Sequence, residues 1–299
     1  MFSIYNKSIN FSGNNTTLNR LSNILNIPIT TKIKNNIIGI HAFKFGNLVL
    51  NKNINFILII GGTDLNIDIH DDNKKAIIKN VCHQAKYIIT FNNYLLEETI
   101  KYTNISKDKI FVIPQSIKKI NIKSNFEIKL YCMNKFNLYK INKIFIMVGN
   151  IRKIKDVLFL EKSFRILSDQ NIYLFIFGNN LDNIKPTKGI YFAGPLNYQK
   201  ILASYSQVDG LINTSISEGM SISILEAMIN KCPIYARNNK SNLDLITHNE
   251  NGFVFKNNIE FKILINKNTD NIVENSYNYV LKNHNEENEK KLYKKLLNS

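Results

Sequence analysis

Hydrophobic residues along this chain gather in short runs that end in glycine or in polar turns. Three of these runs, at 36–41, 54–62 and 86–91, are rich in β-branched residues and too short to form helices. Their apolar character is nearly continuous, so the pattern predicts strands buried on both faces, as in a parallel sheet. The segment 72–85 has helical periodicity instead, and 111–116 is typical of one more strand.

The same alternation restarts in the second half of the chain. The expected strands are 143–150, 172–180, 189–195, 208–215, 233–237 and 251–255, and the expected helices are 156–169, 198–207 and 220–230. The weakly patterned stretch 121–143 is interpreted as a connector, and 259–299 as a charged helical tail. Two series of alternating strands and helices predict two α/β domains, which we place at 1–140 and 141–299.

The composition is that of a globular protein. With 299 residues, of which 44% are hydrophobic, the chain is long enough for two domains with a large core. No apolar run reaches the roughly 18 residues that a membrane span needs. The N-terminal residues lack the pattern of a secretory signal, so we expect a cytoplasmic protein without an integral membrane segment. Cys82, Cys132 and Cys232 are far apart and lack metal-binding spacing, which favours reduced, buried thiols.

The formal net charge of +16 does not change the expectation of a globular protein. A basic protein can bind nucleic acid or an anionic membrane. The lysines are scattered along the whole chain, however, and no known nucleic-acid-binding motif accompanies them. A solvated basic surface is therefore the preferred interpretation, and we expect no nucleic acid partner.

Candidate chemistry is expected beyond the carboxyl ends of the strands, where ligands bind in parallel α/β sheets. The segment SISEGMSISILEAM at 215–228 follows such a strand and continues as a helix. If the helix begins near Met220, the backbone N–H groups of Met220, Ser221 and Ile222 lack intrahelical partners and can bind a phosphate. Gly219 allows a ligand to approach the backbone closely.

The two glutamates of this segment could bind hydroxyl groups. Glu218 lies at the start of the expected helix and Glu226 about two turns into it, where it can face a cleft. Carboxylates form strong hydrogen bonds with hydroxyl donors such as those of a ribose. By spacing alone, a capped helix with two surface glutamates is the better interpretation.

Basic residues follow the first strand of the second half. The segment VGNIRKIKD contains Gly149, Arg152 and Lys155, and the two cations could neutralise a diphosphate. Solvated surface cations explain the same residues if no other feature is considered. In the first half, His41 and the GGTDLN segment at 61–66 come at the ends of two neighbouring strands.

One acidic cluster could be interpreted as a metal site. The segment NIDIHDD collects Asp68, His70, Asp71 and Asp72. Oxygen and imidazole ligands suit several divalent ions, but a polar loop explains these residues as well and is favoured.

Taken in order, these segments resemble a family. The E-x7-E spacing in 215–228, NGFVF at 251–255, VGNIRKIKD and GGTDLN are similar to the retaining, nucleotide-sugar-dependent glycosyltransferases of the group-one (family-four) kind. With SGNNTTLNRL at 12–21 and GIHAFKFG at 39–46, the set is most similar to the eukaryotic glycosyltransferase-1-domain-containing proteins. The resemblance covers about residues 12–255 and implies the GT-B fold, in which two Rossmann-like βαβ domains face each other across a cleft.

The resemblance also implies roles for individual residues. Glu226 would bind the donor ribose, and Glu218 and His41 would lie at the donor sugar. Arg152 and Lys155 would neutralise the diphosphate beside Gly149, and backbone N–H groups would come from Gly219, Met220 and Ser221. Gly13 and Asn14 would lie in an N-terminal loop that closes on the donor. A nucleoside-diphosphate sugar would be the co-substrate, with no metal or other cofactor. The acceptor (glycan, lipid, protein or small molecule) is not specified.

Two positions depart from the family pattern. Asn150 stands where the family usually has arginine, and Gly61 where it usually has histidine. The first alternative is therefore a catalytically weak or inactive GT-B-like protein that binds nucleotide sugars. The second, based only on the charge, is a basic protein that acts on nucleic acid or anionic lipid.

Overall fold

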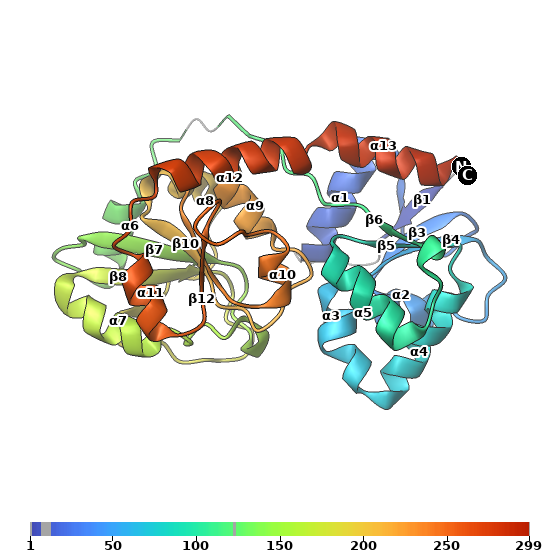
Figure 1. Ribbon diagram of the computed structural model, residues 1–299, viewed down its shortest axis with the longest axis horizontal. Helices are drawn as coiled ribbons and strands as arrows, with labels where there is room; N and C mark the ends of the chain where they lie inside the picture. Colours follow the sequence, from blue (N-terminus) through green and yellow to red (C-terminus); the bar gives the residue numbers. More distant parts are fainter. Residues whose placement is uncertain (1, 7–12, 122–123, 299) are drawn as a thin grey trace. The chain divides into compact units, whose positions relative to one another are not determined.

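The chain forms two α/β units in a computed structural model that describes residues 2–6, 13–121 and 124–298 (Figure 1). The first unit comprises Met1–Ser116, Glu218–Met220 and Asn283–Ser299, and the second comprises Ile117–Ser217 and Ser221–Lys282. The second unit is thus inserted into the first along the sequence.

The first unit contains a six-stranded parallel sheet in the order β2-β1-β3-β4-β5-β6. Its strands are β1 (Ser3–Tyr5), β2 (Ile29–Thr30), β3 (Ile37–Ile40), β4 (Phe56–Ile59), β5 (Tyr87–Thr90) and β6 (Ile110–Val112). Its α-helices are α1 (Gly13–Leu25), α2 (Ala42–Val49), α3 (Gly62–Asn66), α4 (Asp72–Gln84), α5 (Asn93–Thr103) and α13 (Glu286–Leu297). Every residue of β3 and β4 is buried, which confirms strands covered on both faces.

The second unit contains a parallel sheet in the order β12-β11-β10-β7-β8-β9. Its strands are β7 (Lys143–Val148), β8 (Ile172–Phe177), β9 (Ile190–Phe192), β10 (Gly210–Asn213), β11 (Ile234–Arg237) and β12 (Phe253–Phe255). Its α-helices are α6 (Ile128–Phe136), α7 (Glu161–Leu167), α8 (Tyr198–Ser204), α9 (Ile222–Ile229), α10 (Lys240–Leu243), α11 (Asn258–Leu264) and α12 (Asp270–Asn283). Aromatic rings dominate its core: Phe145 contacts Phe164, Tyr235 and Phe261 with ring centroids 5.5–6.1 Å apart.

Each sheet has a point at which the strand order reverses. In the second unit the order is that of a dinucleotide-binding Rossmann sheet, and the reversal falls between β7 and β10. In the first unit it falls between β1 and β3. Ligands of open parallel sheets bind outside the carboxyl ends of the strands at these reversals.

The boundary between the units differs from the expected one. The N-terminal part of the first unit ends at Ser116 rather than at residue 140, and Asn283–Ser299, expected in the second domain, also belong to the first unit. The segment expected to be a connector contains α6. Only two residues of α6, Ile128 and Cys132, are buried, so its helical periodicity is weak. The helix belongs to the second unit, where the Lys135 ammonium donates a hydrogen bond to the Ala193 carbonyl oxygen at 2.7 Å.

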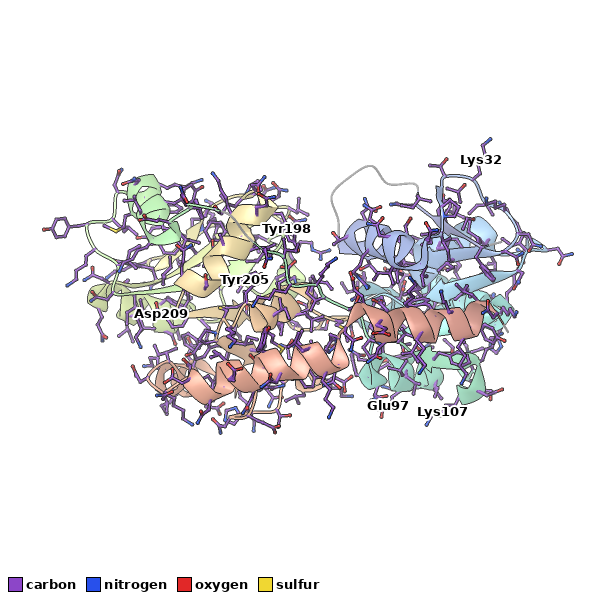
Figure 2. The ribbon with its side chains drawn as sticks, turned by 90° about the horizontal axis from the view of Figure 1, so that it is seen from above. Lys32, Glu97, Lys107, Tyr198, Tyr205 and Asp209 are labelled. Atoms are coloured by element: carbon purple, nitrogen blue, oxygen red, sulfur yellow. The ribbon has the colours of Figure 1, made fainter. Side chains whose placement is uncertain are left out.

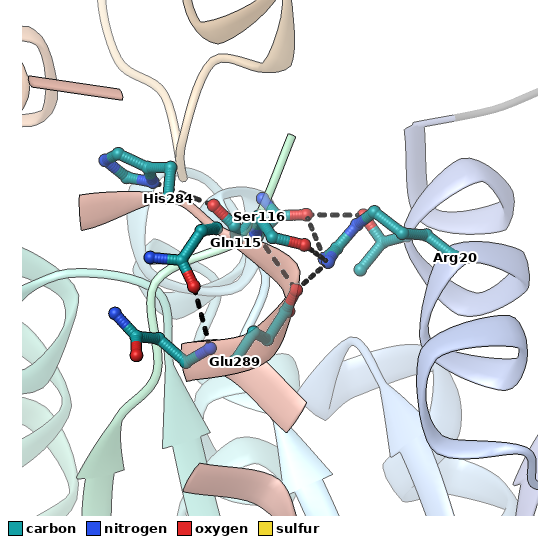
Figure 3. A network of polar contacts seen from close by, with 8 residues as sticks. Arg20, Gln115, Ser116, His284 and Glu289 are labelled. Carbon is teal, nitrogen blue, oxygen red and sulfur yellow. Dashed lines mark hydrogen bonds and ion pairs between the residues drawn. The ribbon is translucent and has the colours of Figure 1, made fainter. Parts of the chain in front are cut away.

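The expected helical tail forms three separate helices, α11, α12 and α13. The last of them returns to the first unit, where it lies beside α1 (Figure 1). A buried polar network fixes it there (Figure 3). Arg20 of α1 forms an ion pair with Glu289 of α13, and the backbone N–H of Ser116 donates to the same carboxylate at 3.0 Å. Arg20 also donates to the Ser116 hydroxyl at 3.0 Å.

The network predicts a pH dependence of stability through His284, which follows α12 and is buried. Its Nδ1 lies 2.7 Å from the carbonyl oxygen of Gln115, which can only accept, so Nδ1 donates the hydrogen bond. Burial lowers the pKa of His284 from its ordinary 6.5. The unfolded chain therefore binds a proton on this residue at a higher pH than the folded chain does. Stability contributed by neutral His284 should be lost as the pH falls below about 6.5.

Urea unfolding at pH 7.5 and pH 5.0 measures this effect. The wild type should lose more stability on acidification than His284→Gln, whose amide can still donate to the Gln115 carbonyl. An equal loss in both proteins would show that His284 does not contribute.

Candidate active site

A small pocket lies at the β7–β10 reversal of the second unit. It is lined by residues that follow the two strands and by the first turn of α9, among them Gly149, Asn150, Lys155, Ser215 and Ser223. Gly149 and Lys155, which were predicted from sequence, are therefore brought together at this point. Arg152 is exposed and does not belong to the lining; its carbonyl oxygen accepts a hydrogen bond from the Lys155 N–H at 2.9 Å.

Two glycines shape this pocket. Gly149 has φ 134°, a conformation that residues with a side chain rarely adopt. A Cβ atom on Gly178, at the end of β8, would lie 2.1 Å from the carbonyl oxygen of Gly149. Gly178 thus lets the β7 loop lie against the end of β8. A glycine directly after a buried strand is a sequence signal of such a close backbone approach.

Helix α9 begins two residues later than expected. It starts at Ile222, with Ser221 as its N-cap. The backbone N–H groups without intrahelical partners therefore belong to the turn that begins at Ile222, not at Met220. The Asn213 side chain at the end of β10 donates to the Ser221 hydroxyl at 3.2 Å. This hydrogen bond links the end of β10 to the start of the helix, where the partial positive charge of the helix dipole lies.

Glu226 is buried in the same helix, with an exposed fraction of 6%. Its Oε1 accepts a hydrogen bond from the Tyr198 hydroxyl at 2.9 Å and its Oε2 one from the Tyr205 hydroxyl at 3.1 Å. Burial raises the pKa of this carboxyl, and the two phenol hydrogen bonds oppose the rise. Glu226 is therefore not a surface glutamate of a capped helix. The sequence did not indicate the two tyrosines as its partners.

In the first unit, His41 follows β3 and is held by Asp64. The backbone of His41 has φ 81°, which is unusual for a residue with a side chain. Its Nδ1 lies 2.5 Å from Asp64 Oδ1 and, more distantly, 3.4 Å from the Lys44 N–H, so we assign the Nδ1 proton to the carboxylate contact. Asp64 Oδ2 accepts from the backbone N–H groups of Ala42 at 2.7 Å and Gly61 at 2.8 Å.

The acidic segment after α3 does not form a site of its own. Asp71 caps α4 by accepting from the Lys74 N–H at 3.0 Å, and the His70 ring lies against Tyr102. Asp68 instead lies 3.7 Å from His41 Nε2, and its other oxygen lies 2.8 Å from the Lys74 ammonium.

Among the described residues, potential metal ligands come together in a different group, which includes only one residue of this acidic segment. Atoms of His41, Asp64 and Asp68 lie within 4.8 Å of one another. Asp64 already accepts hydrogen bonds from backbone N–H groups, and Asp68 is paired with the Lys74 ammonium. Both carboxylates are thus already engaged by hydrogen-bond donors of the protein itself.

The remaining predicted residues group with the first unit. Glu218, Gly219 and Met220 belong to it, and there the Asn66 and Asn92 side chains donate to the carbonyl oxygens of Glu218 and Gly219 at 3.2 and 2.7 Å. Gly13 and Asn14 begin α1 rather than lie in a loop. The start of the expected N-terminal loop lies outside the described residues.

Comparison with known proteins identifies the chain. The sequence pattern of the family "Glycosyl transferases group 1" matches residues 132–293, more than half of the chain. The chain belongs to this glycosyltransferase family. The matched region contains the β7–β10 pocket and α9, so the family assignment and the pocket coincide.

A curated relative supports the assignment along most of the chain. The glycosyltransferase 1 domain-containing protein 1 of Xenopus tropicalis is 28% identical over 277 residues, which are 86% of this chain and 80% of the relative.

Solved structures show the same fold at low sequence identity. Anabaena Alr3699/HepE, solved in complex with UDP-glucose, has a TM-score of 0.78 and 13% identity over 99% of both chains. A glycosyltransferase from Rickettsia africae has a TM-score of 0.68 and 16% identity over 99% of this chain and 89% of its own. The predicted GT-B fold class, built from two six-stranded parallel α/β sheets, is thereby confirmed. No helix in the described part of the transferase is long and apolar enough to cross a membrane.

Proposed function

We propose that this glycosyltransferase moves a sugar from a nucleoside-diphosphate sugar to an acceptor with retention of the anomeric configuration. The observation that carries the proposal is the β7–β10 pocket, where Gly149, Lys155 and the first turn of α9 meet. These groups provide a backbone without a side chain at Gly149, a cation, and N–H donors without intrahelical partners, which together suit a diphosphate. The carboxylate of Glu226 follows in the same helix, where it can bind hydroxyl groups of the donor.

The chemistry of this proposal is mainly electrostatic. As the glycosidic bond breaks, negative charge grows on the diphosphate that leaves. Lys155 and the N-terminus of α9 stabilise this charge with groups that are already positioned before the reaction. The departing phosphate accepts the proton of the acceptor hydroxyl, so no protein nucleophile and no metal ion are assigned. The resemblance also assigns Arg152 and Glu218 to the donor, and His41 to the sugar.

Calorimetric titration with UDP and with GDP tests the donor site. Glu226→Ala should bind the preferred nucleotide about ten- to one hundredfold more weakly than the wild type, because hydrogen bonds to a charged group contribute about 1.5–3 kcal/mol. Glu250→Ala, which removes an exposed glutamate of the same unit, is the matched control and should bind normally. The proposal fails if neither nucleotide binds the wild type more tightly than Glu226→Ala.

A second candidate is a donor-binding protein without significant transfer activity. It is favoured by Asn150, whose side chain accepts from the backbone N–H of Asn179 at 3.2 Å and supplies no positive charge to the pocket. Hydrolysis and transfer assays over a panel of nucleotide sugars distinguish the two candidates, because the second predicts binding without turnover.

A further inference from the structure

The carboxylate of Glu226 is held between two phenols that differ in their access to solvent. Tyr205, which directly follows α8, is completely buried, whereas Tyr198, the first residue of α8, is 50% exposed (Figure 2). Each phenol donates to a different oxygen of the carboxylate. Of these two partners, Tyr198 is therefore the one that separates Glu226 from solvent.

The hydrogen bond of Tyr198 is also the easier one to exchange. A phenol hydroxyl and a sugar hydroxyl are both neutral O–H donors, so either can satisfy Glu226 Oε1. Tyr198 is the first residue of α8, and rotation of its side chain leaves the backbone hydrogen bonds of that helix in place. Tyr205 has no comparable freedom, because moving a buried ring would open a cavity in the core.

A polar partner is required at Glu226 Oε1 at all times. A buried carboxylate that loses a hydrogen-bond donor pays the full cost of its lost hydration. The Tyr198 phenol provides that donor.

We propose that the Tyr198 phenol is a displaceable substitute for a hydroxyl of the nucleotide-sugar donor: it occupies Glu226 Oε1 until a donor hydroxyl replaces it, while Tyr205 holds Oε2 throughout. This inference rests on the proposed function, in which Glu226 binds the donor. It adds that the carboxylate exchanges partners at one oxygen only. Tyr198 is then a specificity residue, since a ligand without a suitable hydroxyl cannot replace the phenol.

Removal of the phenol hydroxyl should strengthen donor binding. In Tyr198→Phe the ligand no longer has to break the Tyr198–Glu226 hydrogen bond, and it restores a partner that the free protein lacks. We expect UDP to bind this variant about tenfold more tightly than the wild type, the lower end of the range for a hydrogen bond to a charged group. The unliganded variant should melt at a lower temperature, because Glu226 has lost a donor.

The experiment compares four full-length proteins by calorimetry: the wild type, Tyr198→Phe, Tyr205→Phe and Tyr139→Phe. Each is titrated with UDP, UDP-glucose and 2′,3′-dideoxy-UDP, and GDP replaces the uridine series if only GDP binds the wild type. Tyr139→Phe removes a hydroxyl from a tyrosine that is 98% exposed and should behave as wild type. Tyr205→Phe should not bind more tightly than wild type, because Tyr205 keeps its hydrogen bond in the bound state.

The ligands distinguish the source of the hydroxyl. If Tyr198→Phe binds UDP more tightly than the wild type does but binds the dideoxy nucleotide equally well, the hydroxyl that replaces the phenol belongs to the ribose. If Tyr198→Phe binds only UDP-glucose more tightly than the wild type does, the hydroxyl belongs to the sugar that is transferred.

Two results would overturn the inference while leaving the proposed function intact. Equal or weaker binding of UDP and UDP-glucose to Tyr198→Phe would show that the phenol is a structural or direct ligand contact. If the affinity of Tyr198→Phe for the dideoxy nucleotide rose as much as its affinity for UDP, no ligand hydroxyl would take the place of the phenol. If no nucleotide or nucleotide sugar binds the wild type or any variant, the proposed function itself fails.

Discussion

Glu289→Ala is expected to lower the free energy of unfolding of the first unit by about 3–5 kcal/mol, the usual cost of removing one partner from a buried ion pair. The Glu289 side chain is 1% exposed and that of Arg20 is 16% exposed. Alanine would leave the Arg20 guanidinium without its carboxylate and would also remove the acceptor of the Ser116 backbone N–H. A domain is commonly stable by only about 5–15 kcal/mol, so this loss is large.

Urea unfolding followed by circular dichroism measures the loss. Glu287→Ala, which removes an exposed glutamate of the same helix, is the control and should change the stability of the first unit little. The transition of the second unit should stay in place in both variants. If Glu289→Ala unfolded at the same urea concentration as Glu287→Ala, the ion pair would contribute nothing.

Asp64→Ala is expected to destabilise the first unit by a similar amount, about 3–5 kcal/mol. The carboxylate is fully buried and accepts hydrogen bonds from the backbone N–H groups of Ala42, Phe43 and Gly61. Each buried N–H that loses its partner costs about 1–3 kcal/mol. The His41 imidazole would lose its Asp64 partner at the same time.

Asp64→Asn is the matched variant for this position. Its single carbonyl oxygen can still accept from part of the backbone donors, and the shape of the side chain is kept. The loss of stability should therefore be clearly smaller than for alanine. Equal losses would show that the shape of the side chain, rather than its acceptors, matters at this site.

The strands could be predicted because their sequence signal is local. Within runs such as 54–62 and 172–180, the residues 56–60 and 172–177 are apolar at every position, which is typical of strands buried on both faces. Helix α6 was missed for the opposite reason: a helix with only two buried residues carries little periodicity. The start of α9 was predicted two residues too early: the helix begins at Ile222 after Ser221, and the contact of Ser221 with Asn213 at the end of β10 is not a local feature of the sequence.

The candidate site was predictable where its residues follow strands. Gly149 comes directly after β7, Lys155 lies farther along the same connection, and the topology of the sheet places both in the pocket. The partners of Glu226 lie 21 and 28 positions away in the sequence, and no local pattern pairs them with a glutamate. The same holds for Asp64 beside His41, because their pairing exists only once β3 and β4 lie next to each other. The functional roles assigned to all of the predicted site residues stay predictions.

The return of α13 to the first unit determines when that unit can be completed during synthesis. Arg20 and Ser116 leave the ribosome early, but Glu289 lies 173 positions after Ser116. At about 5–20 residues per second, translation needs on the order of ten seconds or more to span this interval. Through that time the nascent N-terminal sheet lacks the helix that neutralises Arg20, while the second unit is made and can fold. The part of the protein that is synthesised first is thus the part whose structure is finished last.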